Sequence, residues 1–247
     1  MDVNYINSTM IPLRKSLSRF NSTIITRIKS TTITQINSTS IIQINSTKIT
    51  QSYHDAVSSK EPQYTESQIL NFVLGLEHFQ DAFYREGLKN FTQAQFANYG
   101  FDASFYSNLT EIASQEHTHV TYVTTELRRL KASPVAECKY NFNVTNPSVF
   151  VTTASLIESV SVSAYIDVLS QLRGSAFLKV FSSVLAVEAR HSSFIRAALG
   201  NQPFASPYDT PIDLDEAHTL VELFTVSCPE DNPLGLKVSH HALLDTW

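Results

Sequence analysis

Two Glu-x-x-His motifs, Glu116–His119 and Glu188–His191, are the parts of this chain best suited to do chemistry. In each motif the two side chains lie one helical turn apart, so both can reach the same metal ion. Each motif interrupts the apolar stripe of a predicted helix, and so do two further glutamates, Glu77 and Glu158. Four carboxylates in one interior would repel each other and lose hydration unless cations held them together. The chain order Glu, Glu-x-x-His, Glu, Glu-x-x-His therefore predicts a binuclear metal site inside a helix bundle.

The six candidate ligands divide into shared and separate roles. Glu116 and Glu188 are expected to bridge two ions. Each remaining glutamate is expected to share one ion with the histidine of its own half, in the pairs Glu77 with His119 and Glu158 with His191. Mixed oxygen and imidazole ligands suit two iron ions, or manganese as the alternative, better than zinc, and we expect no organic cofactor. Two other interpretations stay open: surface salt bridges on helices of misjudged phase, and a bundle that binds metal without turnover.

Two tyrosines follow the lone glutamates at the same spacing, Tyr84 after Glu77 and Tyr165 after Glu158. Either phenol could hydrogen-bond a ligand carboxylate or act as a redox-active group, so both are candidate catalytic residues. Plain core packing with a satisfied hydroxyl is the alternative interpretation. His78 and His117 adjoin ligands but lie on other helix faces, so they are expected to support the ligands or to face solvent.

Four helical segments position these residues. Apolar side chains recur at spacings of three and four in each of them, which is typical of amphipathic helices. Ser67 is the candidate N-cap of the first, Pro147 suits the first turn of the third, and Gly200 ends the fourth. The predicted spans are 67–88, 103–131, 147–171 and 175–199.

The connections between the helices indicate the topology. The third and fourth helices are joined by a few residues around Arg173 and Gly174, so they must be antiparallel neighbours. The second and third are separated by residues 131–146, a segment long enough to cross the bundle. One long crossover predicts an all-α, ferritin-like four-helix bundle.

The 247 residues divide into three unlike regions. Residues 1–60 form a low-complexity arm in which an octad repeats, as in ITRIKSTT, ITQINSTS and IIQINSTK, and we expect disorder there in preference to a short β-solenoid. Residues 61–200 hold the bundle, and residues 201–247 form an irregular tail that is expected to pack on it with one short helix at 213–226.

The overall composition limits the classes of partner that the chain is expected to bind. The net charge of -5 gives no global attraction to nucleic acid. No run of 18 apolar residues is present, so no membrane insertion is expected. The two cysteines, Cys138 and Cys228, lie in predicted non-helical segments, and from the residues alone free thiols and a disulfide are equally acceptable. The composition is also compatible with a homo-oligomer.

Four segments resemble the ferritin-like domain of fungal stress-response and plant desiccation-related proteins: ILNFVLGLEHFQDAFYREGL, SQEHTHV, SVSAYID and VEARHSSFIR. The resemblance covers about residues 64–238. It implies a ferritin-like bundle, a di-iron site and an association with stress or desiccation. It also implies a disulfide, because Cys138 and Cys228 match the positions expected for the family's cysteine pair.

The same resemblance implies an extracellular or secretory protein, but the first residues contain no signal peptide as written. Seven Asn-x-Ser/Thr sequons favour the secretory route, and an intracellular or mitochondrial location is the alternative; the sequons are at Asn7, Asn21, Asn37, Asn45, Asn90, Asn108 and Asn143.

The functional hypothesis from the sequence is a di-metal oxidoreductase that acts on dioxygen, peroxide or Fe(II). One alternative is a non-catalytic metal-binding or stress-protective structural protein. The other is a surface or partner-binding protein in which the metal site is vestigial.

Overall fold

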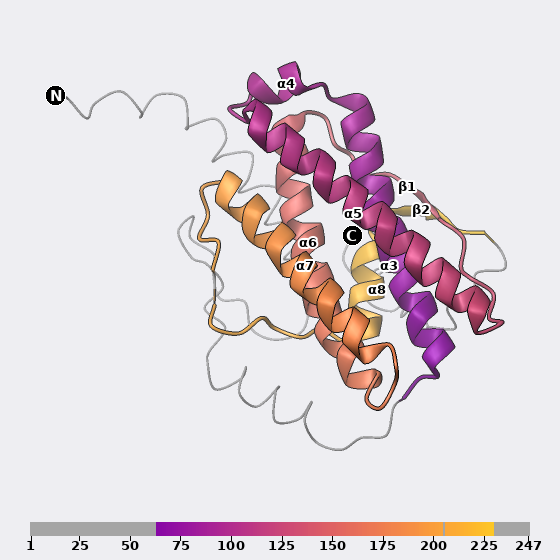
Figure 1. Ribbon diagram of the computed structural model, residues 1–247. Helices are drawn as coiled ribbons and strands as arrows, with labels where there is room; N and C mark the ends of the chain where they lie inside the picture. The colour runs from indigo at the N-terminus through magenta and orange to yellow at the C-terminus, as the bar shows by residue number, and fades with distance from the viewer. Residues whose placement is uncertain (1–62, 205, 230–247) are drawn as a thin grey trace, which may run out of the picture. The chain divides into compact units, whose positions relative to one another are not determined.

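The computed structural model describes residues 63–204 and 206–229, which form a helical bundle (Figure 1). The predicted low-complexity arm, residues 1–60, lies outside the described residues, and so does the end of the predicted tail, from residue 230 onwards.

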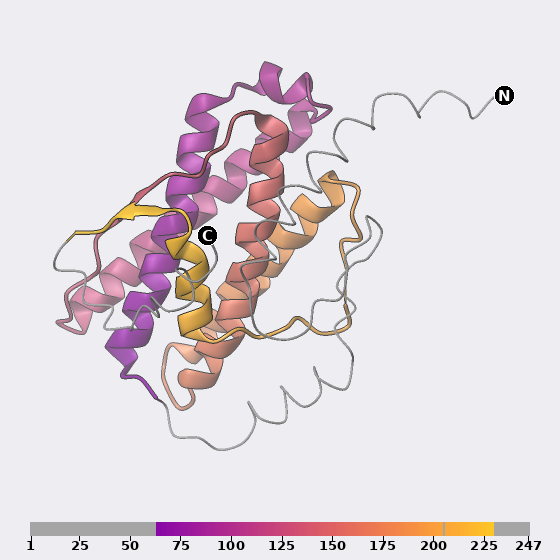
Figure 2. The same cartoon turned by 180° about the vertical axis from the view of Figure 1, so that it is seen from behind.

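Four long helices make up the bundle: α3 (Glu66–Asn90), α5 (Ala103–Arg129), α6 (Pro147–Gln171) and α7 (Leu178–Ala198). α3 packs mainly on α5, and α6 packs mainly on α7. The segment between α5 and α6 runs from one end of the bundle to the other, as Figure 2 shows from behind. The predicted all-α four-helix bundle with one long crossover is therefore confirmed.

The helix ends follow from local side-chain chemistry. Thr65, and not the predicted Ser67, caps α3, because the Thr65 hydroxyl accepts from the Gln68 N–H while the Gln68 side chain accepts from the Thr65 N–H. Asn146 caps α6, and Pro147 occupies the first turn as predicted. Gly200, just beyond α7, has a φ of +72°, a conformation that favours glycine at the end of a helix.

Among the described residues, four short elements lie outside the long helices. The sequence did not predict α4 (Gln93–Ala97), β1 (Lys139–Tyr140) or β2 (Thr225–Ser227). The helix predicted over 213–226 is shorter in the structure, where α8 spans Leu214–Glu222. The last two residues of the predicted span belong instead to β2, which pairs with β1 in antiparallel orientation. Strands of two and three residues are too short to show an alternating pattern.

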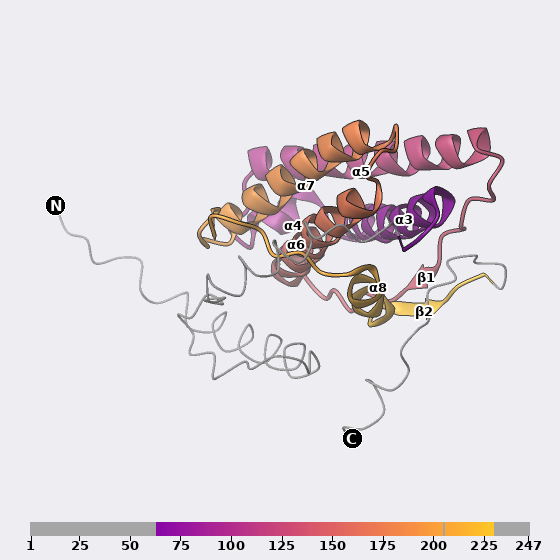
Figure 3. The same cartoon turned by 90° about the horizontal axis from the view of Figure 1, so that it is seen from below.

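The tail and the crossover form an outer layer of the bundle. Seen from below, α8 lies on the outer side of α3 and α6, with β1 and β2 beside it, while α5 and α7 lie on the opposite side (Figure 3). A disulfide between Cys138 and Cys228 joins the crossover to the tail, as the resemblance implied. The Asn141 N–H also donates to the Phe224 carbonyl across the two segments, at 2.7 Å.

Two apolar clusters fill the interior, one toward each end of the bundle. One is mainly aliphatic and includes Leu70, Leu74, Leu127 and Val168. The other is mainly aromatic, and its Phe83 and Phe150 rings stack with centroids 4.5 Å apart. α6 is long and apolar enough to cross a membrane, with a mean hydropathy of 1.5, but 56% of that stretch is buried within the bundle, as expected of a core helix.

Candidate metal centre

The six predicted ligands lie at mid-length of the four long helices, between the two apolar clusters. The four glutamates are 0% exposed, and the two histidine side chains are 12% and 6% exposed. Their helical phase explains this burial, because each replaces an apolar residue on the inward stripe of its helix. The contributions are Glu77 from α3, Glu116 and His119 from α5, Glu158 from α6, and Glu188 and His191 from α7.

These side chains form two overlapping groups whose ligand atoms lie within 4.8 Å of one another. Both groups contain Glu116 and Glu188, the two residues that the sequence predicts as bridges. The first group, which we call the His119 position, adds Glu77 and His119, and the second, the His191 position, adds Glu158 and His191. All six candidate ligands are thus brought together, in the pairing expected from the sequence.

Both histidines turn Nδ1 toward the carboxylates. The distance from His119 Nδ1 is 3.3 Å to Glu77 and 3.4 Å to both Glu116 and Glu188. His191 Nδ1 lies 2.9 Å from Glu116 and 3.6 Å from Glu158. Nδ1 is therefore the nitrogen of each ring that can bind a metal ion.

The buried atoms of the centre fit a metal pair. Many of them make no hydrogen bond within the described part of the chain, although a buried polar atom without a partner costs about 1–3 kcal/mol. Divalent cations satisfy carboxylate oxygens and neutral imidazole nitrogens together, and two of them balance four carboxylates. The atoms are Glu77 Oε2, Glu116 Oε1 and Oε2, Glu158 Oε2, Glu188 Oε1, and Nδ1 of His119 and His191.

Burial also perturbs the acidity of the ligands. Burial, together with the charge of Glu188, raises the pKa of Glu116 well above its usual value, and burial raises the pKa of Glu158 to about 7. Burial would lower the pKa of His191, but Glu116 and Glu158 beside it raise that pKa to about 10. Protons therefore take up part of the charge in the metal-free centre, and metal ions would replace them.

Tyr84 and Tyr165 are connected to the ligands crosswise. Tyr84 of α3 donates a hydrogen bond to Glu158 of α6, and Tyr165 of α6 donates one to Glu77 of α3. Each phenol thus holds the glutamate of the opposite half, not the one in its own helix. Burial raises the pKa of both tyrosines well above its usual value, so they stay protonated donors.

Two glutamines that the sequence did not single out also contact ligands. Gln80 is fully buried, and its amide donates to Glu188 Oε2 at 2.9 Å. Gln115 Oε1 lies 2.9 Å from His191 Nε2. Gln80 follows Glu77 at the spacing of a helix face, a signal that could have identified it. Gln115 precedes His119 by four residues, which is the same kind of signal, but spacing could not show that its partner is His191 of another helix.

The two histidines next to ligands stay outside the centre. His117 is largely exposed, with Nδ1 3.4 Å from Asp81 Oδ1. His78 Nδ1 lies 3.9 Å from Glu137 Oε2. Both contacts are with acidic side chains that are not among the six ligands.

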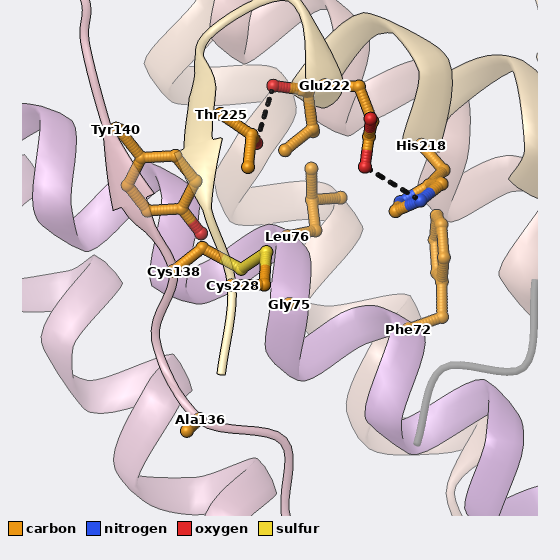
Figure 4. A pocket seen from close by; sticks show the side chains of 11 residues that line it. Phe72, Gly75, Leu76, Ala136, Cys138, Tyr140, His218, Glu222, Thr225 and Cys228 are labelled. Carbon is orange, nitrogen blue, oxygen red and sulfur yellow. Dashed lines mark hydrogen bonds and ion pairs between the residues drawn. A yellow bond between two sulfur atoms is a disulfide. The ribbon is translucent and has the colours of Figure 1, made fainter. Parts of the chain in front are cut away.

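A pocket lies beside the disulfide (Figure 4), and none of the six candidate ligands lines it. It is lined by apolar side chains, by the disulfide and by a His218–Glu222 pair 3.5 Å apart. Its volume of about 30 Å³ is far below the roughly 300 Å³ of the smallest organic-ligand sites. The pocket is therefore too small to hold an organic ligand of ordinary size.

Comparison with known proteins places the ligands within a recognised domain. Residues 65–201, which span all six ligands, match the family model of the ferritin-like domain. The chain is also 28% identical over 165 residues to protein rds1 of Schizosaccharomyces pombe. That match covers 67% of this chain and 40% of rds1, so the chain spans less than half the length of this relative.

Proposed function

Because this chain belongs to the ferritin-like domain family, we propose that its six buried ligands hold two iron ions and support an oxidoreductase reaction with dioxygen, peroxide or Fe(II). The family membership confirms the resemblance seen in the sequence. The single observation that carries the proposal is the pair of overlapping ligand groups that share Glu116 and Glu188. Ligands shared in this way serve two ions better than one.

Each residue of the centre has a defined task in this proposal. Glu116 and Glu188 would bridge the ions, and the His119 and His191 positions would each hold one ion. When bound, the irons would pass electrons to dioxygen or peroxide, and Fe(II) would be the electron donor where it is the substrate. Tyr84 and Tyr165 hold Glu158 and Glu77 in place, and the two apolar clusters keep bulk water out of the centre.

Complete burial of the four glutamates favours small reactants over a bulky organic substrate. The same burial favours a second candidate function, in which the metal pair is structural and the protein protects cells without turnover. The resemblance to fungal stress-response and plant desiccation-related proteins leads us to propose a role in such a response under either function.

Anaerobic reconstitution with Fe(II) tests the proposal and separates the two candidates. We expect about two irons per chain, and consumption of dioxygen or peroxide faster than by the same concentration of free iron. The double variant Glu116→Ala/Glu188→Ala should bind no iron, while Glu86→Ala, which removes an exposed glutamate of α3, should bind two. Two bound irons without turnover would support the structural function, and the absence of bound iron would contradict both.

For localisation, we propose the secretory route. The Cys138–Cys228 disulfide suits an oxidising compartment. The sequon asparagines Asn90, Asn108 and Asn143 are all exposed, so each is accessible to glycans. Digestion of the protein from its own cells with an amide-cleaving glycosidase should lower its mass and convert the occupied asparagines to aspartates. An unchanged mass, together with free thiols at both cysteines, would contradict this route.

A further inference from the structure

The two halves of the metal centre have the same ligands in the same order. The α3–α5 half and the α6–α7 half each supply a lone glutamate, a Glu-x-x-His motif and a tyrosine. The crosswise hydrogen bonds of Tyr84 and Tyr165 preserve this correspondence. Any difference between the two metal positions must therefore come from the residues around the ligands.

One such difference is the group that contacts Nε2 of the ligand histidine, the ring nitrogen that faces away from the carboxylates. Gln115 immediately precedes the ligand Glu116 on α5, and its Oε1 lies 2.9 Å from Nε2 of His191 on α7. The amide group of the same side chain donates to Glu111 Oε1 at 3.2 Å. Because a carboxylate only accepts hydrogen bonds, Glu111 holds the NH₂ group of Gln115 and leaves its oxygen facing His191.

This arrangement prepares His191 for a metal ion. With Oε1 of Gln115 as acceptor, the ring proton of neutral His191 resides on Nε2, and Nδ1 keeps its lone pair. Nδ1 is the nitrogen that faces Glu116 and Glu158. Gln115 therefore fixes both the tautomer and the orientation that metal binding requires.

The other half lacks these groups. Val187 precedes Glu188 and corresponds to Gln115 of the first half. Ser183, four residues before Val187, corresponds to Glu111. Valine cannot accept a hydrogen bond. Among the described residues none makes a hydrogen bond with Nε2 of His119, and the His119 side chain is 12% exposed against 6% for His191.

We propose that the two metal positions are unequal, and that the His191 position binds the first ion more tightly because Gln115 is a positioning residue for His191. This inference rests on the proposed function, since it assumes that the ligands hold metal. Hydrogen-bond partners of a metal-binding histidine typically change affinity about 10- to 100-fold. We therefore expect the two dissociation constants of the native protein to differ by at least about 10-fold.

Gln80 offers a matched comparison. It is fully buried like the ligands and donates to Glu188 at 2.9 Å, but Glu188 belongs to both metal positions. Loss of Gln80 should therefore weaken both positions together and keep their ratio, whereas loss of Gln115 should weaken only the His191 position.

Titration of the full chain with Co²⁺, in competition with a chelator, tests the proposal without relying on turnover. The native protein should bind two ions in separate steps, and anomalous scattering at one equivalent should place cobalt at the His191 position. In Gln115→Leu the tighter step should weaken about 10-fold or more, so that the two steps merge. Gln115→Glu keeps an acceptor oxygen and should restore the two separate binding steps. The melting temperature should be unchanged in both variants.

Several outcomes would overturn the inference. Equal affinities in the native protein would do so, as would a first cobalt at the His119 position, or a Gln115→Leu variant with the native ratio of affinities. In each of these cases cobalt still binds, so the proposed metal function would stand. Only a chain that binds no cobalt at all would overturn both. In the converse variant Val187→Gln, the weaker step should tighten, and an unchanged step would contradict the role assigned to the glutamine.

Discussion

The ligand layer at the centre of the bundle and the outer layer of crossover and tail are held together in opposite ways. The ligand layer buries four carboxylates and leaves many of their atoms without hydrogen bonds. The outer layer is joined by a disulfide, a short β-ladder and the packing of α8 on α6 and α3. The first arrangement adds little to the stability of the metal-free chain, because the cost of burying the carboxylates offsets their contacts with the two histidines, and the second stabilises the fold without metal.

We therefore expect metal binding and stability to depend on different parts of the chain. A change in the ligand layer should remove metal and leave the metal-free fold nearly intact. A change in the outer layer or in the apolar clusters should lower stability and leave the metal content unchanged.

The largest effect is expected from Glu116→Gln. Glutamine keeps the shape of a residue that both metal positions share, but it removes the charge. Affinity should fall more than about 100-fold at both positions, since a direct ligand is worth more than its hydrogen-bond partners. Metal analysis of protein equilibrated with a chelator measures the loss, and denaturant unfolding of the metal-free chain should be nearly unchanged. Glu86→Gln, at an exposed site, is the control.

Removal of the disulfide comes next. Cys138 and Cys228 close a loop across 90 residues of sequence, so the double variant Cys138→Ser/Cys228→Ser should lose about 2–4 kcal/mol of unfolding free energy. Urea unfolding with and without reductant measures it, because reductant should destabilise the native chain and not the variant. Two metal ions per chain should still bind, and a variant that folds but loses metal would break the separation.

Gly87→Ala should destabilise the aromatic cluster. A Cβ at residue 87 would lie 1.9 Å from Cε2 of Phe150, whose ring stacks on Phe83. Overpacking of this kind costs about 1–3 kcal/mol. Thermal unfolding should show the loss, and Phe150→Leu in the same chain should recover part of it by making room. If Gly87→Ala unfolds at the native temperature, the close packing of α3 on α6 at this point is wrong.

Tyr165→Phe should give the smallest effect. The change removes the hydrogen bond to Glu77 but keeps the ring in the core. Affinity at the His119 position should fall about 10-fold, measured by the same chelator competition. Tyr84→Phe should act on the His191 position instead, because its partner is Glu158. The opposite assignment would show that each tyrosine supports the glutamate of its own helix.

The burial and mutual proximity of the six candidate ligands could be predicted from the sequence because burial and helical period leave a strong pattern. A glutamate such as Glu158 stands out in α6, where most inward positions are apolar. Spacings of three and four residues then assign Glu188 and His191 to one face of α7. The four long helices were predicted to within a few residues for the same reason.

Contacts between helices were not predictable in this way. The partner of Tyr84 depends on which helices adjoin across the bundle, and the sequence left open which ligand carboxylate it would be. Gln115 is one turn from Glu111 and next to a ligand, yet its role depends on a histidine of α7. β1 and β2 pair two segments that are distant in the sequence and that the disulfide also joins, so neither strand has a local signal.

Metal content of the full chain measures whether the six buried side chains bind two metal ions. The protein, reconstituted anaerobically with Fe(II) and freed of loosely bound ions by gel filtration, should hold two irons per chain by elemental analysis. The Glu116→Ala/Glu188→Ala variant, folded and treated alike, should hold none. Equal metal content in the two proteins, or no metal in either, would contradict the account.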